Sequence, residues 1–279
     1  MELFGKVIQV MDAQMKEPEM FGWFHLAFFA LTFIAAYVMC RQYPKADEKT
    51  VRNLLLAASI VSIVLELYKQ FNFSFTYDGS VVKYDYQWYS FPFQFCSTPM
   101  YAGLLAGLLR KGKVQNAICS YLATFSVFAG LCVMIYPPQV FVETIGINIQ
   151  SMICHGSMIT VGIYLLYTEY VRLEHKTILN AIPVFAVFVT IASVMNEIAY
   201  RSGLLERETF NMFFISPYCE PSLPVYSSVQ AVVPYPLSAI IYVAVFSLAA
   251  YVILLLAMCV KTLAKKYRYI REKQKTVSV

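Results

Sequence analysis

Residues 234–260 read PYPLSAIIYVAVFSLAAYVILLLAMCV, a run without a single Asp, Glu, Lys or Arg. About 20 apolar residues are enough to cross a bilayer as a helix, because the hydrocarbon layer is about 30 Å thick. Lipid offers no partner to an exposed backbone N–H or C=O group, so a spanning segment has to satisfy these groups within its own helix. The run therefore predicts a transmembrane helix.

The same pattern recurs along most of the chain. Long charge-free stretches such as 20–40, 114–142 and 144–168 precede this run, and a further apolar stretch at 53–68 is interrupted only by Glu66. We therefore predict an all-α, polytopic membrane protein folded as a bundle of seven transmembrane helices. The expected spans are 21–41, 52–72, 91–109, 114–136, 149–171, 178–200 and 234–260.

Composition supports this class and excludes others. Of the 279 residues, 59% are hydrophobic, 14% are charged and 16% are aromatic, and the mean hydropathy is +0.58. Soluble domains carry about 25% charged residues. The low charge excludes a disordered chain, a nucleic-acid-binding protein and an ordinary cytosolic enzyme.

Seven spans place the two termini on opposite sides of the membrane. The loops at 41–52, 110–113 and 172–177 and the chain after residue 260 hold most of the 22 basic residues. Basic residues accumulate on the cytoplasmic side, so we expect the N-terminus outside and the C-terminus in the cytoplasm. The expected organisation is an amphipathic N-terminal segment at 1–20, a transmembrane domain at 21–260 and a basic cytoplasmic tail at 261–279.

Polar side chains in the predicted spans meet at one depth. An ionisable residue inside a membrane is costly to bury and indicates a functional site by default. With a helical rise of about 1.5 Å per residue, the set lies roughly 6–9 Å from the outer ends of its spans. Its members are His25, Glu66, Cys96, His155, Asn196 and Glu197, with Gln94 beside them. This convergence predicts one polar pocket in the outer half of the bundle. The alternative is that each side chain extends separately to a nearby interface.

A thiol beside an imidazole is the minimal activated nucleophile. The histidine accepts the thiol proton, and the thiolate attacks an acyl carbonyl. Cys96 and His155 are the candidates for these roles, and Glu66 or Glu197 is expected to support the histidine. His25, Gln94 and Asn196 are expected to contact the substrate. Most of the remaining cysteines, Cys154 among them, are expected to be small buried apolar residues, and Cys219 is expected in an outer loop.

Short motifs resemble a known family. FPFQFCS at 91–97, CHG at 154–156, NMFF at 211–214 and the PYP turn at 234–236 resemble, in order and spacing, bacterial YwaF-like integral membrane proteins and the eukaryotic transmembrane protein 164 family. The histidine that the family has two positions before the cysteine is Gln94 here.

The resemblance implies an acyltransferase that moves fatty acyl chains between lipids through a Cys–His pair, which is Cys96 and His155 in this sequence. It also adds Asn211 and Tyr235 to the expected substrate contacts. It implies a multi-pass protein of a bacterial cell membrane, with phospholipid or lysophospholipid as partner.

The sequence leaves several functions open. The first is a lipid acyltransferase or acyl hydrolase with no metal and no cofactor. The second is a non-catalytic protein that binds a lipid or small molecule, and the third is a transporter or channel. A metal site is a weaker hypothesis, because the donors His25, Glu66, Cys96, His155 and Glu197 include no closely spaced ligand pair. We expect membrane lipids and no nucleic acid as partners.

Overall fold

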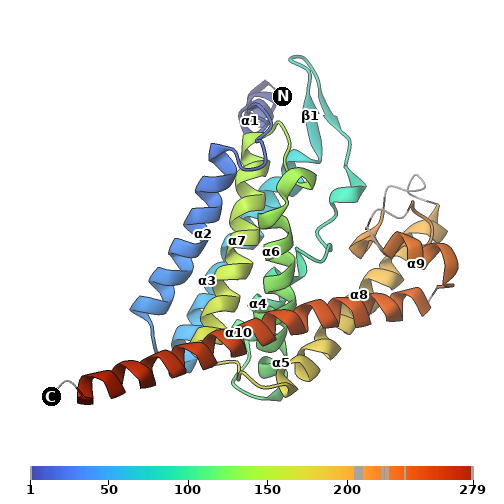
Figure 1. Ribbon diagram of the computed structural model, residues 1–279. Coiled ribbons are helices and arrows are strands. Elements are labelled where there is room, and N and C mark those ends of the chain that lie inside the picture. The colour runs from blue at the N-terminus through green and yellow to red at the C-terminus, as the bar shows by residue number, and fades with distance from the viewer. Residues whose placement is uncertain (1, 204–209, 221–222, 224–225, 236, 278–279) are drawn as a thin grey trace.

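The computed structural model of the protein describes residues 2–203, 210–220, 223, 226–235 and 237–277. Residues 1, 236, 278 and 279, which belong to the predicted terminal segments and last span, lie outside that description. Within the described residues, six helical runs are long and apolar enough to cross a membrane (Figure 1). They are Trp23–Gln42 (α2), Glu48–Asn72 (α3), Lys113–Ile135 (α5 and α6), Ile145–Tyr167 (α7), Lys176–Ser202 (α8) and Leu237–Arg271 within α10.

The predicted span at 91–109 is only partly helical. Its helix, Thr98–Leu108 (α4), has 11 residues and is about 16 Å long, which is short of the roughly 30 Å hydrocarbon layer. Residues 91–97 form turns and bends instead, with Pro92 near their start and Pro99 in the first turn of α4. A proline has no N–H for the helical ladder and is tolerated only in its first turn. Seven full-length helices are therefore not confirmed.

The short helix α4 nevertheless packs along α3 and runs toward the first turn of α3. Gly103 of α4 faces Ser59 of α3, and the two helices pack closely along their length. After α4, the backbone N–H of Lys111 donates to the carboxylate of Glu48 at 3.1 Å. The segment 91–108 thus runs antiparallel to α3 along most of that helix.

The run Lys113–Ile135 is not a regular α-helix throughout. It consists of Lys113–Tyr121 (α5), a π-helical turn at Leu122–Ser126 (η2) and Val127–Ile135 (α6). A π-helical turn widens a helix locally, and such turns are frequent at functional sites. The whole of this turn is buried and packs against α7.

Helix α7 is the central helix of the bundle, with α2, α3 and α6 packed against it. Small residues allow the close approach that membrane helices use in place of a hydrophobic driving force. A methyl group on Gly156 would lie 2.5 Å from Oγ1 of Thr32 in α2. A methyl group on Gly130 of α6 would lie 2.9 Å from the carbonyl oxygen of His155. The glycine of the CHG motif is therefore required by the packing of α2 on α7.

One end of the bundle carries additional structure, visible at the top of Figure 1. The amphipathic helix Glu2–Met11 (α1) packs its Phe4 ring on Phe71 and Phe75. The antiparallel strands Phe75–Tyr77 (β1) and Val82–Tyr84 (β2) form a hairpin there. The remaining short helices are Trp88–Ser90 (η1), Pro137–Gln139 (η3), Met212–Phe214 (η4) and Tyr226–Val232 (α9).

Helices α8 and α10 complete the bundle on the side of α5 and η2. Helix α10, Leu237–Val277, has 41 residues and runs obliquely past the bundle in Figure 1. At about 1.5 Å per residue it is roughly 61 Å long, about twice the thickness of the hydrocarbon layer. Its last turns hold the basic residues of the predicted tail, and Lys261 forms an ion pair with Glu169 at the end of α7.

Candidate functional site

A cavity of about 230 Å³ lies between α3, the segment 91–103, η2 and α7. Four of the nine predicted site residues line it: Glu66, Gln94, Cys96 and His155. They come from three segments that are distant in the sequence, so the fold assembles the core of the predicted polar pocket in one place. The other five predicted residues are not among the described residues that line this cavity.

The imidazole of His155 has one occupied and one free nitrogen. Nδ1 lies 2.7 Å from the carbonyl oxygen of Ser151, one helical turn earlier. A carbonyl oxygen only accepts, so Nδ1 carries the proton, and Nε2 of the neutral ring carries the lone pair. Nε2 is buried and has no hydrogen-bond partner among the described residues. Because buried polar atoms are nearly always paired, this nitrogen has the features of a base that awaits a proton donor.

Cys96 lies in the non-helical segment that leads into α4. The carbonyl oxygen of Gln94 accepts the backbone N–H groups of Ser97 and Thr98, at 2.9 and 3.2 Å, which closes a turn around Cys96. The neighbouring Phe95 packs its ring on Phe185 and Phe213 in the aromatic core. The thiol is free and lines the cavity. A non-helical backbone anchored on both sides therefore presents this thiol.

Gln94 also fixes the segment to the NMFF motif. Its Nε2 donates to the carbonyl oxygen of Asn211 at 2.9 Å, and its Oε1 accepts the N–H of Phe213 at 2.8 Å. Asn196 holds the same motif from α8, because its amide accepts from the N–H of Met212 at 2.8 Å and donates to its carbonyl at 3.0 Å. Gln94 and Asn196 therefore both form hydrogen bonds with the same short loop, residues 211–213.

This loop has an unusual backbone. Phe213 and Phe214 both have positive φ, at 59° and 57°, which is rare for bulky residues. Such conformations persist only where the surroundings determine them. The hydrogen bonds that Gln94 and Asn196 form with this loop supply these surroundings.

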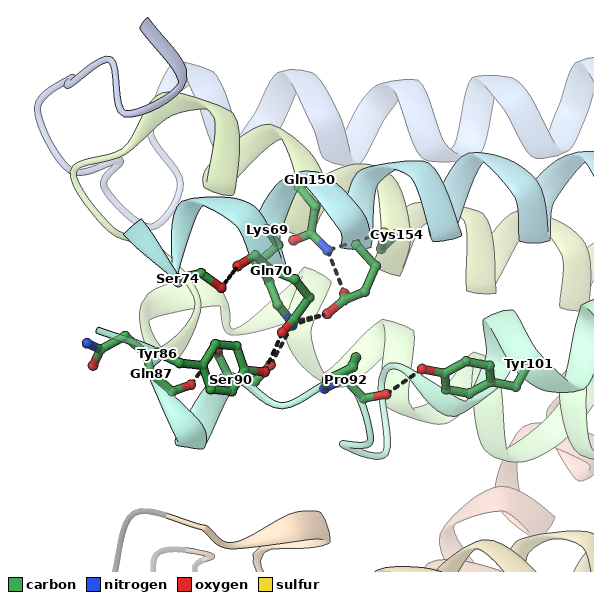
Figure 2. Close-up of polar contacts among 11 residues, drawn as sticks. Lys69, Gln70, Ser74, Tyr86, Gln87, Ser90, Pro92, Tyr101, Gln150 and Cys154 are labelled. Atoms are coloured by element: carbon green, nitrogen blue, oxygen red, sulfur yellow. Dashed lines mark hydrogen bonds and ion pairs between the residues drawn. The ribbon is translucent and has the colours of Figure 1, made fainter. Parts of the chain in front are cut away.

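Glu66 is the centre of a hydrogen-bonded network at the polar end of the cavity. Figure 2 shows its partners Lys69, Gln70 and Gln150. Its carboxylate forms an ion pair with Lys69 at 2.8 Å and accepts from the amides of Gln70 at 2.8 Å and Gln150 at 3.2 Å. Gln70 in turn donates to the carbonyl oxygen of Ser90 at 2.9 Å. A buried carboxylate needs this many donors to offset the loss of water.

The structure does not place Glu66 as the expected support of His155. Its hydrogen bonds go to Lys69, Gln70 and Gln150, whereas the ring of His155 is oriented by the carbonyl of Ser151. The physical reason is spacing: Ser151 lies one turn from His155 on the same helix, whereas Glu66 is held by partners on α3 and α7.

His25 pairs with the backbone rather than with the cavity. The N–H of Phe21 donates to its Nδ1 at 3.0 Å, and its Nε2 donates to the carbonyl oxygen of Met134 at 2.8 Å. Both ring nitrogens are therefore occupied, and the ring fastens the start of α2 to the end of α6.

Glu197, Asn211 and Tyr235 also lie apart from the cavity. Glu197 forms an ion pair with Arg201 and accepts the hydroxyl of Tyr218 near the surface, and this carboxylate raises the pKa of Tyr218. Asn211 starts η4, and its side chain accepts the N–H of Ser216 at 2.9 Å. Tyr235 is half-buried in the turn before α10.

The cavity includes residues that the sequence did not single out. Lys69, Gln150, Ser151 and Cys154 line it, and Cys154 accepts a weak hydrogen bond from Gln150 at 3.6 Å. A helical spacing connects them to the predicted residues. On α3 the lining positions 62, 66 and 69 share one face, and on α7 positions 150, 151, 154 and 155 do the same. These four residues could therefore have been found by following the helix face that carries Glu66 on α3 and the face that carries His155 on α7.

Within the parts of the chain that the structure describes, no group of three or more His, Cys, Asp or Glu side chains is placed to hold a metal ion. In the cavity, the carboxylate of Glu66 is already occupied by its three donors.

Comparison with known proteins places the chain in a family. The model of the TMEM164 family matches residues 19–267, which include all six long helical runs up to residue 267 and the whole cavity. Comparisons with curated proteins and with solved structures gave no match.

Proposed function

The chain belongs to the TMEM164 family of multi-pass integral membrane proteins, and from this premise we propose that it is a lipid acyltransferase or acyl hydrolase that uses Cys96 and His155. Its substrates are phospholipids and lysophospholipids. The observation that carries the proposal is the buried Nε2 of His155, which has no hydrogen-bond partner in the described part of the chain, in a residue that lines the same cavity as Cys96.

The reaction runs in two steps. The sulfur of Cys96 attacks the ester carbonyl of the donor lipid while its proton passes to Nε2 of His155. The ester bond breaks, the released alcohol takes that proton from Nε2, and the acyl group stays on Cys96 as a thioester. An acceptor hydroxyl, from a lysolipid or from water, then gives its proton to Nε2 and attacks the thioester. The thiol is regenerated as the acyl group leaves.

The local backbone supports the first step. The backbone N–H of Cys96 donates to no backbone carbonyl among the described residues outside regular helices and strands, unlike those of Ser97 and Thr98. A backbone N–H beside the nucleophile is placed to stabilise the negative charge that develops on the carbonyl oxygen. Ser151 keeps the His155 ring in the tautomer that accepts the thiol proton.

The shape of the cavity supports an amphiphilic substrate. Polar side chains such as Glu66, Lys69 and Gln94 line one end, and apolar ones such as Leu55, Met100 and Val161 line the other. The polar end lies beside Phe73, Tyr89 and Ser90, which follow α3 in the chain. The distribution of basic residues favours this end as the exoplasmic one, with the N-terminus outside and the C-terminus inside a bacterial cell membrane. A phospholipid of the outer leaflet is then the acyl donor.

A non-catalytic lipid-binding role is the second candidate, because an amphipathic cavity binds a lipid whether or not its thiol reacts. Transport is less favoured. Among the described residues, the charged lining side chains, Glu66 and Lys69, both lie at the polar end, and the deeper lining consists of serines and apolar residues, whereas an ion needs polar groups along its whole path.

Covalent labelling separates these functions. Purified protein in nanodiscs is incubated with phospholipid, and thioesters are detected by intact mass and by their cleavage with hydroxylamine. We expect one acyl group per chain, lost in Cys96→Ala and retained in Cys154→Ala, which removes the second cavity thiol, and in Cys132→Ala, which removes an exposed thiol. Lipid turnover that persists in Cys96→Ala overturns the proposal.

A further inference from the structure

Helix α10 continues well beyond its apolar part. Residues 261–277 remain helical, and they hold seven basic residues against one acidic residue, Glu272. In the same stretch the side chains of Leu263, Tyr267 and Ile270 are exposed. Large exposed apolar side chains on so charged a helix are informative when they share a face, because scattered ones are common on any protein surface.

These three side chains do share a face. They follow one another at spacings of four and three residues, which is the pattern of an apolar stripe along one side of a helix. Val260, the last residue of the charge-free run, lies three residues before Leu263 and is exposed as well. The stripe therefore continues from the apolar part of α10 into its charged part. We call Val260, Leu263, Tyr267 and Ile270 the terminal stripe.

Basic side chains border the terminal stripe on both sides. At about 100° per residue, Lys266 and Lys273 project beside one border, Arg268 and Arg271 project beside the other, and Lys265 lies opposite the stripe. Long basic side chains in such positions reach the headgroup level while the apolar face meets the acyl chains. An apolar face bordered by Lys and Arg is typical of helices that lie in the plane of a membrane interface.

The course of α10 agrees with such a location. Lys261 forms an ion pair with Glu169, just after α7, so the charged part of α10 begins level with the end of that helix. From there the last turns extend sideways past the ends of α2 and α3 in Figure 1, at the end of the bundle opposite to α1. A helix that runs across this end, instead of prolonging the axis of α7, stays near the membrane surface.

We propose that residues 261–277 lie on the membrane surface, with the terminal stripe in the interface and the basic residues on the headgroups of anionic phospholipids. Charge complementarity selects this partner, because each basic residue near an anionic surface strengthens the association by roughly fivefold. An acidic protein is a less favoured partner, because the terminal stripe continues directly from a segment that is already in the membrane. The inference does not depend on the reaction proposed for Cys96.

The test follows backbone amide hydrogen exchange of residues 262–277 in the full-length protein in nanodiscs. One preparation contains phosphatidylcholine alone, and the other contains equal parts of phosphatidylcholine and anionic phosphatidylglycerol. A helix held on the surface opens less often, so we expect exchange to be about tenfold slower in the anionic nanodiscs. Raising the salt concentration from about 0.1 M to about 1 M shortens the Debye length from about 10 Å to about 3 Å and should remove that difference.

Two tyrosines provide a matched pair of variants. Tyr267 and Tyr269 are almost equally exposed, at 69% and 66%, but Tyr269 lies on the other side of the helix from the terminal stripe. Tyr267→Ser should speed exchange by about threefold or more in the anionic nanodiscs, because it removes apolar surface from the interface. Tyr269→Ser should leave exchange unchanged. Equal effects of the two variants would contradict the proposed orientation of the helix.

Charge variants test the choice of lipid. The triple variant Lys266→Gln/Arg268→Gln/Lys273→Gln should largely remove the difference between the two lipid compositions. Lys83→Gln, an exposed basic residue of the hairpin at the opposite end of the bundle, should preserve it. Equal exchange of the native protein in both kinds of nanodisc overturns the proposal and leaves the basic face to an acidic protein partner.

Discussion

The Nδ1 atom of His155 lies 2.7 Å from the carbonyl oxygen of Ser151, one turn earlier in α7. This bond is made by the backbone, so no substitution of Ser151 that preserves the helix removes it. It fixes the tautomer in which Nε2 carries the lone pair, as the proposed role of a base requires. In serine hydrolases a carboxylate orients the histidine, whereas here the backbone carbonyl of Ser151 takes that place.

The first prediction concerns this ring. His155→Gln removes the proton acceptor and should lower the rate of Cys96 acylation by about 10²- to 10⁴-fold, the usual contribution of a general base. His175→Gln is the matched control, because His175 contacts Tyr251 on the exposed side of the bundle and should leave the rate unchanged. The acylation rate of both variants is measured by stopped flow, as the release of nitrophenol from a p-nitrophenyl ester. Equal rates in His155→Gln and the native protein would exclude His155 as the base.

The second prediction concerns the ion pair between buried Glu66 and partly buried Lys69. Lys69→Met leaves the carboxylate of Glu66 without its cation, and the loss of one partner of a buried pair costs about 3–5 kcal/mol. The double variant Glu66→Gln/Lys69→Met removes both charges and should recover most of that stability. Unfolding in a mild detergent, followed by denaturant titration, measures the difference.

The control for this pair is the exposed ion pair of Lys83 with Asp78, at 3.6 Å. Lys83→Met should change the free energy of unfolding by no more than about 1 kcal/mol, as for other surface pairs. If Lys69→Met were as mild as Lys83→Met, the pair with Glu66 would not be buried in solution.

The third prediction concerns the hydrogen bonds of Gln94 and Asn196 to the NMFF loop. Gln94→Ala and Asn196→Ala each leave backbone groups of residues 211–213 without partners, which costs about 1–3 kcal/mol. Because both amides hold the same loop, the double variant should lose less than the sum of the two. Asn53→Ala, an exposed amide on α3, is the control and should be nearly neutral. Strict additivity in thermal unfolding would show that the two amides act independently.

The fourth prediction concerns the hairpin turn. Asp78 accepts from the backbone N–H of Val81 at 2.9 Å and from the N–H and hydroxyl of Ser80, and these bonds hold its pKa well below the usual 3.8. A lowered pKa in the folded state means that the turn is fully stabilised above pH 3.8. The contribution is lost as the pH falls from there toward the folded-state pKa.

An NMR titration of the labelled carboxyl carbon of Asp78 checks this directly. We expect no change between pH 7 and pH 5 and a midpoint below 3.8. Asp78→Asn removes the titrating group and should make hairpin protection independent of pH in this range. A midpoint at or above 3.8 in the native protein would mean that these hydrogen bonds do not form in solution.

The sequence predicted which polar residues share a depth, but not which share a direction. The helical rise places Glu66, His155 and Asn196 at similar levels, because depth follows from counting residues. The direction around each helix axis depends on packing, which the count does not contain. Asn196 consequently faces the loop at Met212, while Glu66 and His155 face the cavity.

The third span shows a similar limit. An absence of charge identifies residues 91–109 as apolar, but it does not distinguish a helix from an irregular segment that is buried among other helices. Pro92 and Pro99 were the available signal, and they mark the two sides of the non-helical part. The hydrogen bond between Gln94 and Phe213 joins positions more than a hundred residues apart, and no local pattern predicts such a pair.

The length of α10 has a consequence for the environment of the protein. Tyr242 and Phe246, near its start, pack into the aromatic cluster that surrounds Phe95 and Phe185. The apolar part of the helix, residues 237–260, is roughly 36 Å long, so it is expected to match a hydrocarbon layer of about 30 Å by tilting. A change of bilayer thickness would then move Tyr242 and Phe246, and with them the rings next to Cys96.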